Sequence, residues 1–529
     1  MLSTPRAFRG MVTAPHHLAA EAGLRVLHEG GNAIEAMIAT AATIPVVYPH
    51  MNAIGGDGFW IVAEPGKAPI GIDACGAAGA AVTPEFYRSK GLAQIPTRGP
   101  LAANTVAGTV AGWGAAHRIA QRWGGTMPLA RLLEDAIAYA RDGFPVTVSQ
   151  ARFTAEKQAE CQDAPGFADT FLVDGKAPPP GARFKQAALG ETLARIARAG
   201  TNDFYRGELA RRIAADLARA GSPITADDLN QHQAKEVVPL SIQLKIGTVF
   251  NMTPPTQGLA SLLILGLFER CGVTEADGFE YLHALVESTK LAFRIRDRYV
   301  TDPAHMTVTP QSLLEPAEID RLARDFDARR AAPWPAPPQK GDTIWMGVID
   351  GKGRAASFIQ SIYWEFGSAV VLRDTGILWQ NRGTSFSLDP AAPQALKPGR
   401  KPFHTLNPAF ARLKDGRSMV YGTMGGDGQP QTQAAIFTRY ALFGQSPQEA
   451  VTAPRWLLGR TWGTAVTRLR LESRHPPEVV RRLAEAGHDL DVLTPFTDLM
   501  GHAGLIAHHP TGLLEGAADP RGDGAVAAF

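Results

Sequence analysis

A proline-rich run that leads into an alternating strand pattern places the strongest limit on how this chain can fold. The run Pro-Trp-Pro-Ala-Pro-Pro at residues 333–338 is rich in residues without a backbone N–H, so it cannot form a helix or a central strand. The stretch from Thr343 to Asp350 then alternates in the way that is typical of a strand. We therefore expect residues 326–342 to form an exposed linker and Thr343 to begin a strand.

The two sides of this linker differ in their sequence pattern. Before it the periodicity is mostly helical, as in the amphipathic stretch 279–299, and Asn32 with Glu35 forms a capping box ahead of a buried helix. After it the pattern predicts strands at 355–363, 369–372, 376–379, 418–422 and 504–508, with helices at 432–443 and 477–486. The sequence thus predicts a helix-rich part, residues 1–342, and a sheet-rich part, residues 343–529.

The charge and cysteine content exclude several classes of protein. The net charge is +2 and there is no long basic run, which argues against nucleic acid or a membrane surface as the main partner. The three cysteines lie far apart without C-x-x-C spacing, which argues against a disulfide framework or a structural zinc site. The first residues lead to no apolar segment and there is no run of membrane-spanning length, so we expect a soluble cytoplasmic protein.

Thr343 is a candidate nucleophile because of where it stands. A threonine hydroxyl needs an adjacent base, and a residue at a new amino terminus carries its own base, the free α-amine. That amine has an ordinary pKa of about 7.7–8.0, so part of it is neutral near pH 7. Exposing it requires cleavage of the bond between Asp342 and Thr343. The alternative is that Thr343 only begins a strand after a linker, and the local sequence alone favours this alternative.

A glycine-rich loop at residues 421–431 is a second candidate. It contains Gly425 and Gly426, whose consecutive N–H groups suit an oxyanion hole, but this evidence alone favours a tight turn that needs positive φ. The loop lacks the spacing of phosphate-binding motifs, so nucleotide binding is a weak hypothesis. His404 stands in a polar His-Thr-x-Asn run, and no histidine has partners at metal-ligand spacing, so we expect neither a metal nor a cofactor.

Taken in order, these stretches resemble the γ-glutamyltransferase family, whose members are N-terminal-nucleophile hydrolases. The segments that carry the resemblance are 13–16, 30–33, 49–50, 55–59, 106–113, 297–303, 342–343, 376–378, 402–408, 425–426 and 519–521. The resemblance implies an α+β fold, a four-layer αββα sandwich. It also implies a zymogen that cuts itself into chains 1–342 and 343–529, which then stay associated.

The resemblance also assigns roles to individual residues. Thr343 is the nucleophile, and Ser361 falls where the family has a threonine whose hydroxyl hydrogen-bonds the nucleophile's amine. Gly425 and Gly426 fall on the oxyanion glycines. The departures from the family lie in the pocket that binds the glutamyl group: Cys75 replaces an arginine, Ser385 an acidic residue, Arg382 a glutamine, Tyr363 an asparagine, and His404-Thr405 a pair of serines.

These departures indicate a changed substrate. A site that loses an anion and gains a cation is no longer suited to an amino-acid head group, and Arg382 could instead hold a carboxylate bidentately. A surface ion pair is the alternative for Arg382. The stretches around Arg382 and His404 look like the subgroup that includes oxamate amidohydrolase and acylase-like members.

The sequence therefore predicts a self-processing amidohydrolase acting on a small carboxylate-bearing amide such as oxamate. One alternative is a γ-glutamyltransferase or glutathione hydrolase, and another is an uncleaved relative that only binds. The expected partners are the small amide and the other half of the cleaved chain, and a homo-oligomer is left open.

Overall fold

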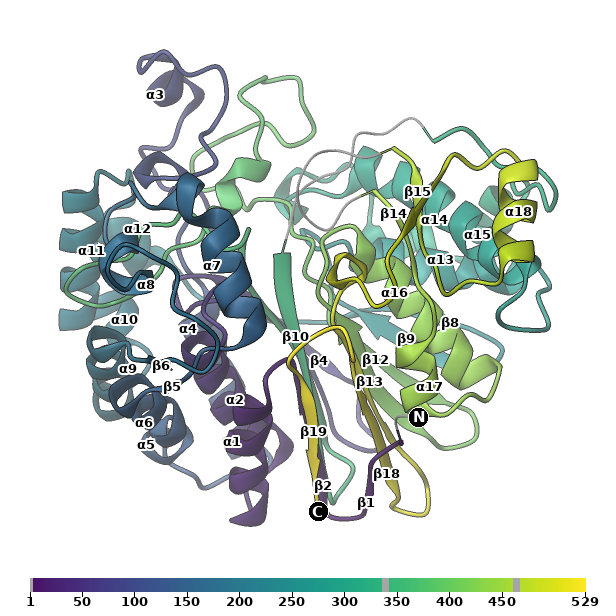
Figure 1. Cartoon of the computed structure of the whole chain (residues 1–529), viewed down its shortest axis with the longest axis horizontal. Coiled ribbons are helices and arrows are strands. Elements are labelled where there is room, and N and C mark those ends of the chain that lie inside the picture. The colour runs from purple at the N-terminus through teal and green to yellow at the C-terminus, as the bar shows by residue number, and fades with distance from the viewer. Residues whose placement is uncertain (1–2, 335–341, 460–466) are drawn as a thin grey trace.

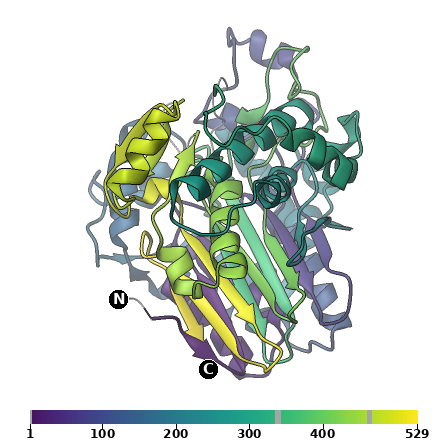
Figure 2. The same cartoon turned by 90° about the vertical axis from the view of Figure 1, so that its right-hand side faces the viewer.

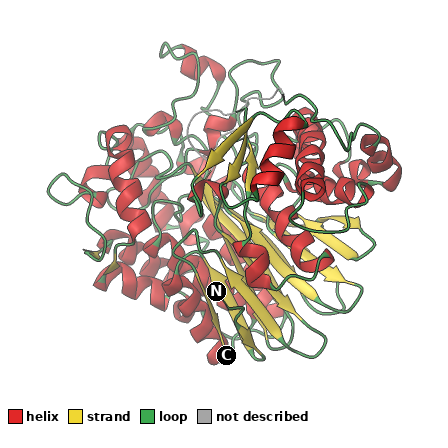
Figure 3. Cartoon of the chain, turned by 45° about the vertical axis from the view of Figure 1, so that its right-hand side comes forward, coloured by secondary structure: helices red, strands yellow, loops and turns green. Residues whose placement is uncertain are grey.

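Two stacked β-sheets between two layers of helices form the protein (Figure 1). The structure, a computed structural model, describes residues 3–334, 342–459 and 467–529. Residues 335–341, most of the proline-rich part of the predicted linker, lie outside these ranges. Helices cover the outer face of each sheet (Figure 3), which is the αββα sandwich expected from the sequence.

Each of the two main sheets has seven antiparallel strands within the described ranges. The first sheet runs in the order β19 (Ala525–Ala528), β2 (Gly10–Ala14), β10 (Asp342–Asp350), β11 (Ala355–Tyr363), β3 (Asp57–Ala63), β4 (Ile70–Asp73) and β7 (Lys235–Val237). The second runs in the order β1 (Arg6–Ala7), β18 (Leu514–Ala518), β17 (Ala503–His508), β13 (Ser418–Thr423), β12 (Ala409–Leu413), β9 (Gly247–Asn251) and β8 (Leu240–Gln243). Both sheets therefore take strands from both sides of the linker, and the two predicted parts form one body.

Smaller strands lie outside the two main sheets. They are β14 (Trp456–Leu458), β15 (Leu469–Glu472) and β16 (Leu490–Leu493), and the pair β5 (Phe144–Pro145) and β6 (Arg183–Phe184).

The helices divide between the two outer faces (Figures 1 and 2). On the side of the first sheet lie α1 (His17–His28), α2 (Ala33–Val47), α3 (Pro84–Arg88), α4 (Thr109–Arg122), α5 (Leu129–Leu132), α6 (Glu134–Asp142), α7 (Val148–Cys161), α8 (Phe167–Phe171), α9 (Ala187–Ala199), α10 (Asp203–Arg206), α11 (Glu208–Ala220) and α12 (Ala226–Gln231). On the side of the second lie α13 (Gly258–Arg270), α14 (Phe279–Tyr299), α15 (Pro316–Ala323), α16 (Gly428–Phe437), α17 (Pro447–Thr452) and α18 (Pro477–Glu485). No helix in the described part of the chain is long and apolar enough to cross a membrane.

Helix α2 shows how local sequence positions these layers. Asn32 accepts hydrogen bonds from the backbone N–H groups of Ile34 and Glu35, and the Glu35 carboxylate accepts the N–H of Asn32, so the predicted capping box is confirmed. Every residue of α2 is buried, which fits a helix that is apolar all round and lies inside the helix layer. Between the sheets lies a separate apolar core that includes Met11, Phe59 and Trp345.

Most predicted elements are confirmed, and two are wrong. The strand 355–363 and the helix 279–299 have the predicted bounds. The predicted strands at 369–372 and 376–379 meet only in a single bridge between Val371 and Leu378. Their backbone cannot stay extended, because Ala369 (φ 62°) and Gly376 (φ 66°) are left-handed. The predicted helix 432–443 begins earlier, at Gly428, and ends in a π-helical turn, Thr438–Leu442.

Candidate active site

The hairpin of β10 and β11 positions Thr343. Strand β10 lies between β2 and β11, and Thr343 is fully buried near its beginning. Asp342 pairs with Tyr363 and Ile344 pairs with Gln360, so β11 holds one residue more than β10 across this interval. Such a bulge bends the strand and redirects side chains, and Tyr363 accordingly has a left-handed backbone (φ 83°). Thr343 therefore lies beside an irregular end of β11.

Ser361 stands at this bulge and joins two other predicted site residues. Its Oγ accepts a hydrogen bond from the Tyr363 N–H (2.8 Å) and one from Arg382 Nη2 (3.3 Å). Ser361 is directly opposite Asp57 of β3 in the sheet register. Thr343, Ser361 and Asp57 thus lie on three successive strands, which are about 4.8 Å apart in a β-sheet.

Arg382 is a buried cation that contacts Ser361. It begins a short 3-10 turn, η4 (Arg382–Ser385), and its guanidinium carbon lies 4.0 Å from the centre of the Tyr363 ring. The side chain is 0% exposed, so the surface ion pair left open by the sequence is wrong. Its Nε and Nη1 have no hydrogen-bond partner in the described part of the chain. Burial lowers the pKa of Arg382 to about 10, while Tyr363 and Asp57 partly oppose this shift.

His404 and Thr405 lie on a buried loop across from Arg382. His404 donates its backbone N–H to Pro255 (2.9 Å), and its Nε2 lies 3.4 Å from Asp57 Oδ2. Burial, with the charges of Arg382 and Lys401, holds the pKa of His404 well below its ordinary value, so the imidazole is neutral near pH 7. Thr405 is fully buried, and its carbonyl oxygen accepts a hydrogen bond from Gln257 Nε2 (2.8 Å).

Gly425 and Gly426 form the bend between β13 and α16. Both have left-handed φ angles, 121° and 51°, so the turn that requires glycine is present. Gln257 Nε2 also donates to the carbonyl oxygen of Gly426 (2.7 Å), and Gln257 Oε1 accepts from Arg296 Nη1 (2.9 Å). Arg296 Nη1 in turn donates to Asp427 Oδ1 (2.8 Å). A fully buried network thus fixes the peptide planes of this bend.

Sequence reasoning missed Gln257 and Arg296. Both contact residues that are far away in the sequence, and no local sequence pattern links them to Gly426. The available signals were weak: Gln257 is a polar residue directly before the apolar helix α13, and Arg296 precedes the noted stretch 297–303.

Two other residues of the expected substrate pocket have further surroundings of their own. The Ser385 hydroxyl is buried without a partner among the described residues and lines a neighbouring cavity of about 300 Å³, together with Arg296, Asp297, Phe386, Gln394 and Phe403. Cys75, which is fully buried, donates its thiol proton to Asp73 Oδ1 (3.1 Å), and Lys401 Nζ donates to Asp73 Oδ2 (2.6 Å). Among the hydrogen bonds of the described residues, none joins Ser385 or Cys75 to Arg382.

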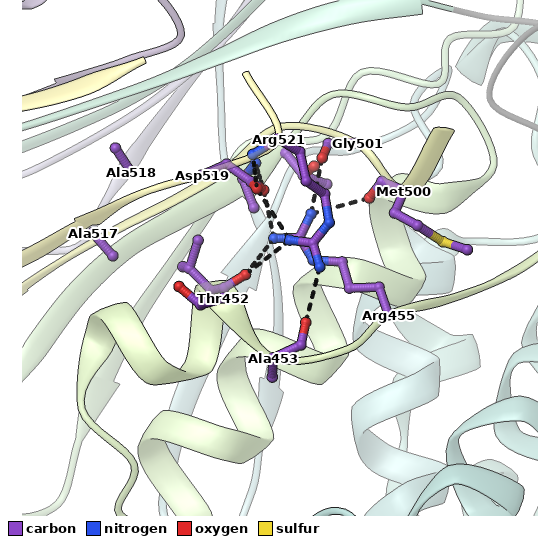
Figure 4. Close-up of polar contacts among 12 residues, drawn as sticks. Thr452, Ala453, Arg455, Met500, Gly501, Ala517, Ala518, Asp519 and Arg521 are labelled. Carbon is purple, nitrogen blue, oxygen red and sulfur yellow. Dashed lines mark hydrogen bonds and ion pairs between the residues drawn. The ribbon is translucent and has the colours of Figure 1, made fainter. Parts of the chain in front are cut away.

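The stretch Asp519-Pro520-Arg521 is part of a buried ion network rather than of the pocket (Figure 4). Arg455 Nη2 donates to Asp519 Oδ2 (2.5 Å), and Arg521 Nη1 donates to Asp519 Oδ1 (3.1 Å). Arg455 Nη1 also donates to the carbonyl oxygen of Gly501 (2.9 Å). A Cβ at Gly501 would meet the Met424 carbonyl, so the network braces a segment packed directly against the Gly425–Gly426 bend.

One group of side chains has the composition of a metal site. His283, Glu287 and His488 place their ligand atoms within 4.8 Å of one another. Each already has protein partners: His283 Nδ1 lies 2.9 Å from His488 Nε2, and Glu287 accepts from Lys290 Nζ (2.7 Å) and from the Ala332 N–H (3.0 Å). The described contacts of this cluster link α14 to the segment that enters the linker.

Comparison with known proteins agrees with this architecture. The profile of the family described as gamma-glutamyltranspeptidase matches residues 19–529. The chain is 56% identical over 530 residues to an oxamate amidohydrolase proenzyme of Klebsiella pneumoniae, with all of both chains covered. It is 42% identical over 519 residues to a glutathione hydrolase-like YwrD proenzyme of Bacillus subtilis, with 98% of each covered. A cephalosporin acylase structure from Bacillus halodurans superposes with a TM-score of 0.92 at 34% identity, covering 100% of this chain and 97% of that one.

Proposed function

Because this chain belongs to the gamma-glutamyltranspeptidase family and is an N-terminal-nucleophile hydrolase, we propose that it is cut between Asp342 and Thr343 and then hydrolyses a small carboxylate-bearing amide such as oxamate. The cut would give chains 1–342 and 343–529. Because each sheet takes strands from both, the two chains would stay associated without a covalent link. The description of two relatives as proenzymes supports the cleavage step.

The proposed reaction uses the new amino terminus as base. The α-amine of Thr343 accepts the hydroxyl proton while Oγ attacks the amide carbon, and the Ser361 hydroxyl helps to orient that amine. The N–H groups of Gly425 and Gly426 stabilise the oxyanion. The α-ammonium then returns its proton to the leaving nitrogen, ammonia departs and an ester to Thr343 remains. Water, deprotonated by the same amine, hydrolyses the ester.

The buried Arg382 is the observation that supports this substrate. A fully buried guanidinium with unpaired donors is costly to keep, and a bound carboxylate would satisfy it. Arg382 contacts Ser361 on β11, the strand next to the one that carries Thr343. The anchor and the nucleophile are therefore both next to β11. This arrangement supports a substrate whose carboxylate is attached directly, or through one carbon, to the scissile carbonyl.

The same geometry weakens the glutathione alternative. A γ-glutamyl group carries its carboxylate three carbons from the scissile carbonyl and needs a partner for its ammonium group. Ser385 faces the neighbouring cavity, and the Cys75 thiol is bound to Asp73. The name of the Bacillus subtilis relative nevertheless keeps glutathione as the second candidate.

A direct comparison of two activities tests the proposal. Purified protein is incubated with oxamate and, separately, with glutathione, and the release of ammonia and of glutamate is measured. We expect ammonia from oxamate in large excess over glutamate from glutathione. The opposite order would favour the glutathione hydrolase, and a single intact chain without either activity would favour a binding protein. Gel filtration tests the homo-oligomer, and cell fractionation tests the cytoplasmic location, both of which stay predictions.

A further inference from the structure

Asp57 is a buried carboxyl group that the proposed mechanism does not use. It belongs to the Gly-Gly-Asp-Gly stretch at residues 55–58 and begins β3. Its Oδ1 accepts hydrogen bonds from the backbone N–H groups of Gly76 (2.9 Å) and Gly108 (3.0 Å). Its Oδ2 lies 3.4 Å from His404 Nε2, and the Gln380 side chain also lies close enough to the carboxyl group to lower its pKa. Asp57 thus has one fixed oxygen and one oxygen directed at a neutral imidazole.

The position of Asp57 relates it to Arg382. Ser361 stands between them: it pairs with Asp57 across the two strands and accepts a hydrogen bond from Arg382 Nη2. Burial raises the pKa of Asp57 to about 7, against the lowering effect of the Gly76 N–H and of Arg382. Asp57 is therefore close to half ionised near neutral pH.

The other charged and titratable groups around Asp57 and His404 balance one another. They are Lys401 with Asp73, the Cys75 thiol, and the hydroxyls of Tyr363 and Tyr205. Lys401 and Asp73 form an ion pair of 2.6 Å, and burial raises the pKa of the Cys75 thiol well above its ordinary value, so that thiol is neutral. Arg382 is then the cation of the pocket, and Asp57 is the carboxyl group that can balance it.

We propose that Asp57 is a specificity-determining residue that balances the charge of Arg382 in the free enzyme and takes up one proton, shared with His404, when a substrate carboxylate binds Arg382. This inference rests on the proposed role of Arg382 as the carboxylate anchor. Two carboxylates beside one buried guanidinium repel each other, so one of them is driven to its neutral form. The proton comes from solvent and is held between Asp57 Oδ2 and His404 Nε2, and no covalent bond is broken. Substrate binding is therefore coupled to proton uptake.

Isothermal titration calorimetry of the processed enzyme tests this coupling. The probes are oxalate, the product of the proposed reaction, and acetate, a simple carboxylate, each titrated at pH 6 and pH 8 in buffers of different ionisation enthalpy. We expect close to one proton taken up at pH 8 and little at pH 6. Because the pKa of Asp57 is about 7, the protonated fraction falls about tenfold between these pH values, and the Kd should rise about tenfold.

Asp57→Asn is the matching variant. The asparagine side-chain oxygen can still accept the N–H groups of Gly76 and Gly108, so the local fold is kept. We expect its proton uptake to vanish and its Kd to become independent of pH from 6 to 8. Asp216→Asn removes another buried carboxylate, on α11 and outside the pocket, and should behave like the wild type.

The outcomes separate this inference from the proposed function. Proton-coupled binding of acetate without turnover of oxamate would support the role of Asp57 and overturn the proposed substrate. Turnover of oxamate with no proton uptake, or with equal uptake in Asp57→Asn, would overturn the role of Asp57 and leave the proposed function standing. If Asp57 instead held a substrate ammonium, Asp57→Asn would lose affinity for amino acids, which also contradicts the proposal. If the variant does not fold, the proton uptake of the wild type still tests the inference: uptake at pH 8 but not at pH 6 supports it, and no uptake at either pH overturns it.

Discussion

Replacing Arg382 with glutamine is expected to weaken substrate binding without weakening the fold. In the free protein the guanidinium is fully buried and has two nitrogen atoms without partners among the described residues. Its removal from water therefore destabilises the fold. Glutamine removes that destabilisation, and its amide ends two covalent bonds short of the Nη2 atom that contacts Ser361. We therefore expect the free energy of unfolding to stay equal or to rise.

The expected loss of activity can be worked from the same contacts. A carboxylate at Arg382 gains two charge-assisted hydrogen bonds of about 1.5–3 kcal/mol each, and part of this gain is spent on desolvating the carboxylate. A net value of about 3–4 kcal/mol corresponds to a fall in kcat/KM of about 10²–10³-fold, since about 1.4 kcal/mol is tenfold.

Steady-state ammonia release from oxamate and thermal unfolding measure the two effects on one preparation. Arg412→Gln is a suitable control, because Arg412 is partly buried but donates only to the carbonyl oxygen of Glu64 within the described residues. It should leave kcat/KM unchanged. An Arg382→Gln enzyme whose kcat/KM stays within threefold of the wild type would refute the role of Arg382 as anchor.

Two substitutions and one pH dependence test the surroundings of the pocket. Gln257→Leu removes the hydrogen bond to the Gly426 carbonyl, which holds the proposed oxyanion N–H groups in place. Because an oxyanion contact acts in the transition state, kcat should fall by about tenfold or more with little change in KM. A rise in KM as large as the fall in kcat would contradict this. Asp519→Asn breaks a buried ion network and should cost about 3–5 kcal/mol of stability, measured by urea unfolding. Burial alone would raise the pKa of Asp519, but Arg455 and Arg521 outweigh burial and lower it. The ionised Asp519 therefore stabilises the fold above the pKa that the residue has in the unfolded chain. This stabilisation is lost as the pH falls through the lower pKa of the folded state. The difference between wild type and Asp519→Asn should therefore shrink below about pH 4, and a constant difference would argue against this linkage.

Local sequence patterns predicted the elements whose determinants are local. The capping box at Asn32 and the strand 355–363 follow from short-range rules and agree with the structure. The segments 369–372 and 376–379 do not form the strands expected of them, because each contains a residue with a left-handed backbone. An alternating sequence pattern does not show which residues adopt that conformation. Local determinants thus account for the framework more completely than for its irregular segments.

The pocket was harder to predict because its properties arise from contacts that are remote in sequence. The resemblance supplied the positions of Ser361, Arg382 and the glycine pair. It did not reveal that Arg382 is fully buried with donors that lack partners among the described residues, that Ser385 lines a cavity with Arg296 and Phe403, or that Gln257 holds the glycine bend. Burial and hydrogen-bond satisfaction depend on how the sheets pack, and they become visible only in the folded chain.

Mass spectrometry with N-terminal sequencing of the purified protein tests the self-cleavage most directly. We expect two chains in the wild type, the smaller beginning at Thr343, and one uncut, inactive chain in Thr343→Ala. Thr343→Ser, which keeps a hydroxyl, should still be cut. Cleavage at the same bond in Thr343→Ala, or oxamate hydrolysis by a wild-type chain that remains intact, would contradict the terminal-threonine mechanism.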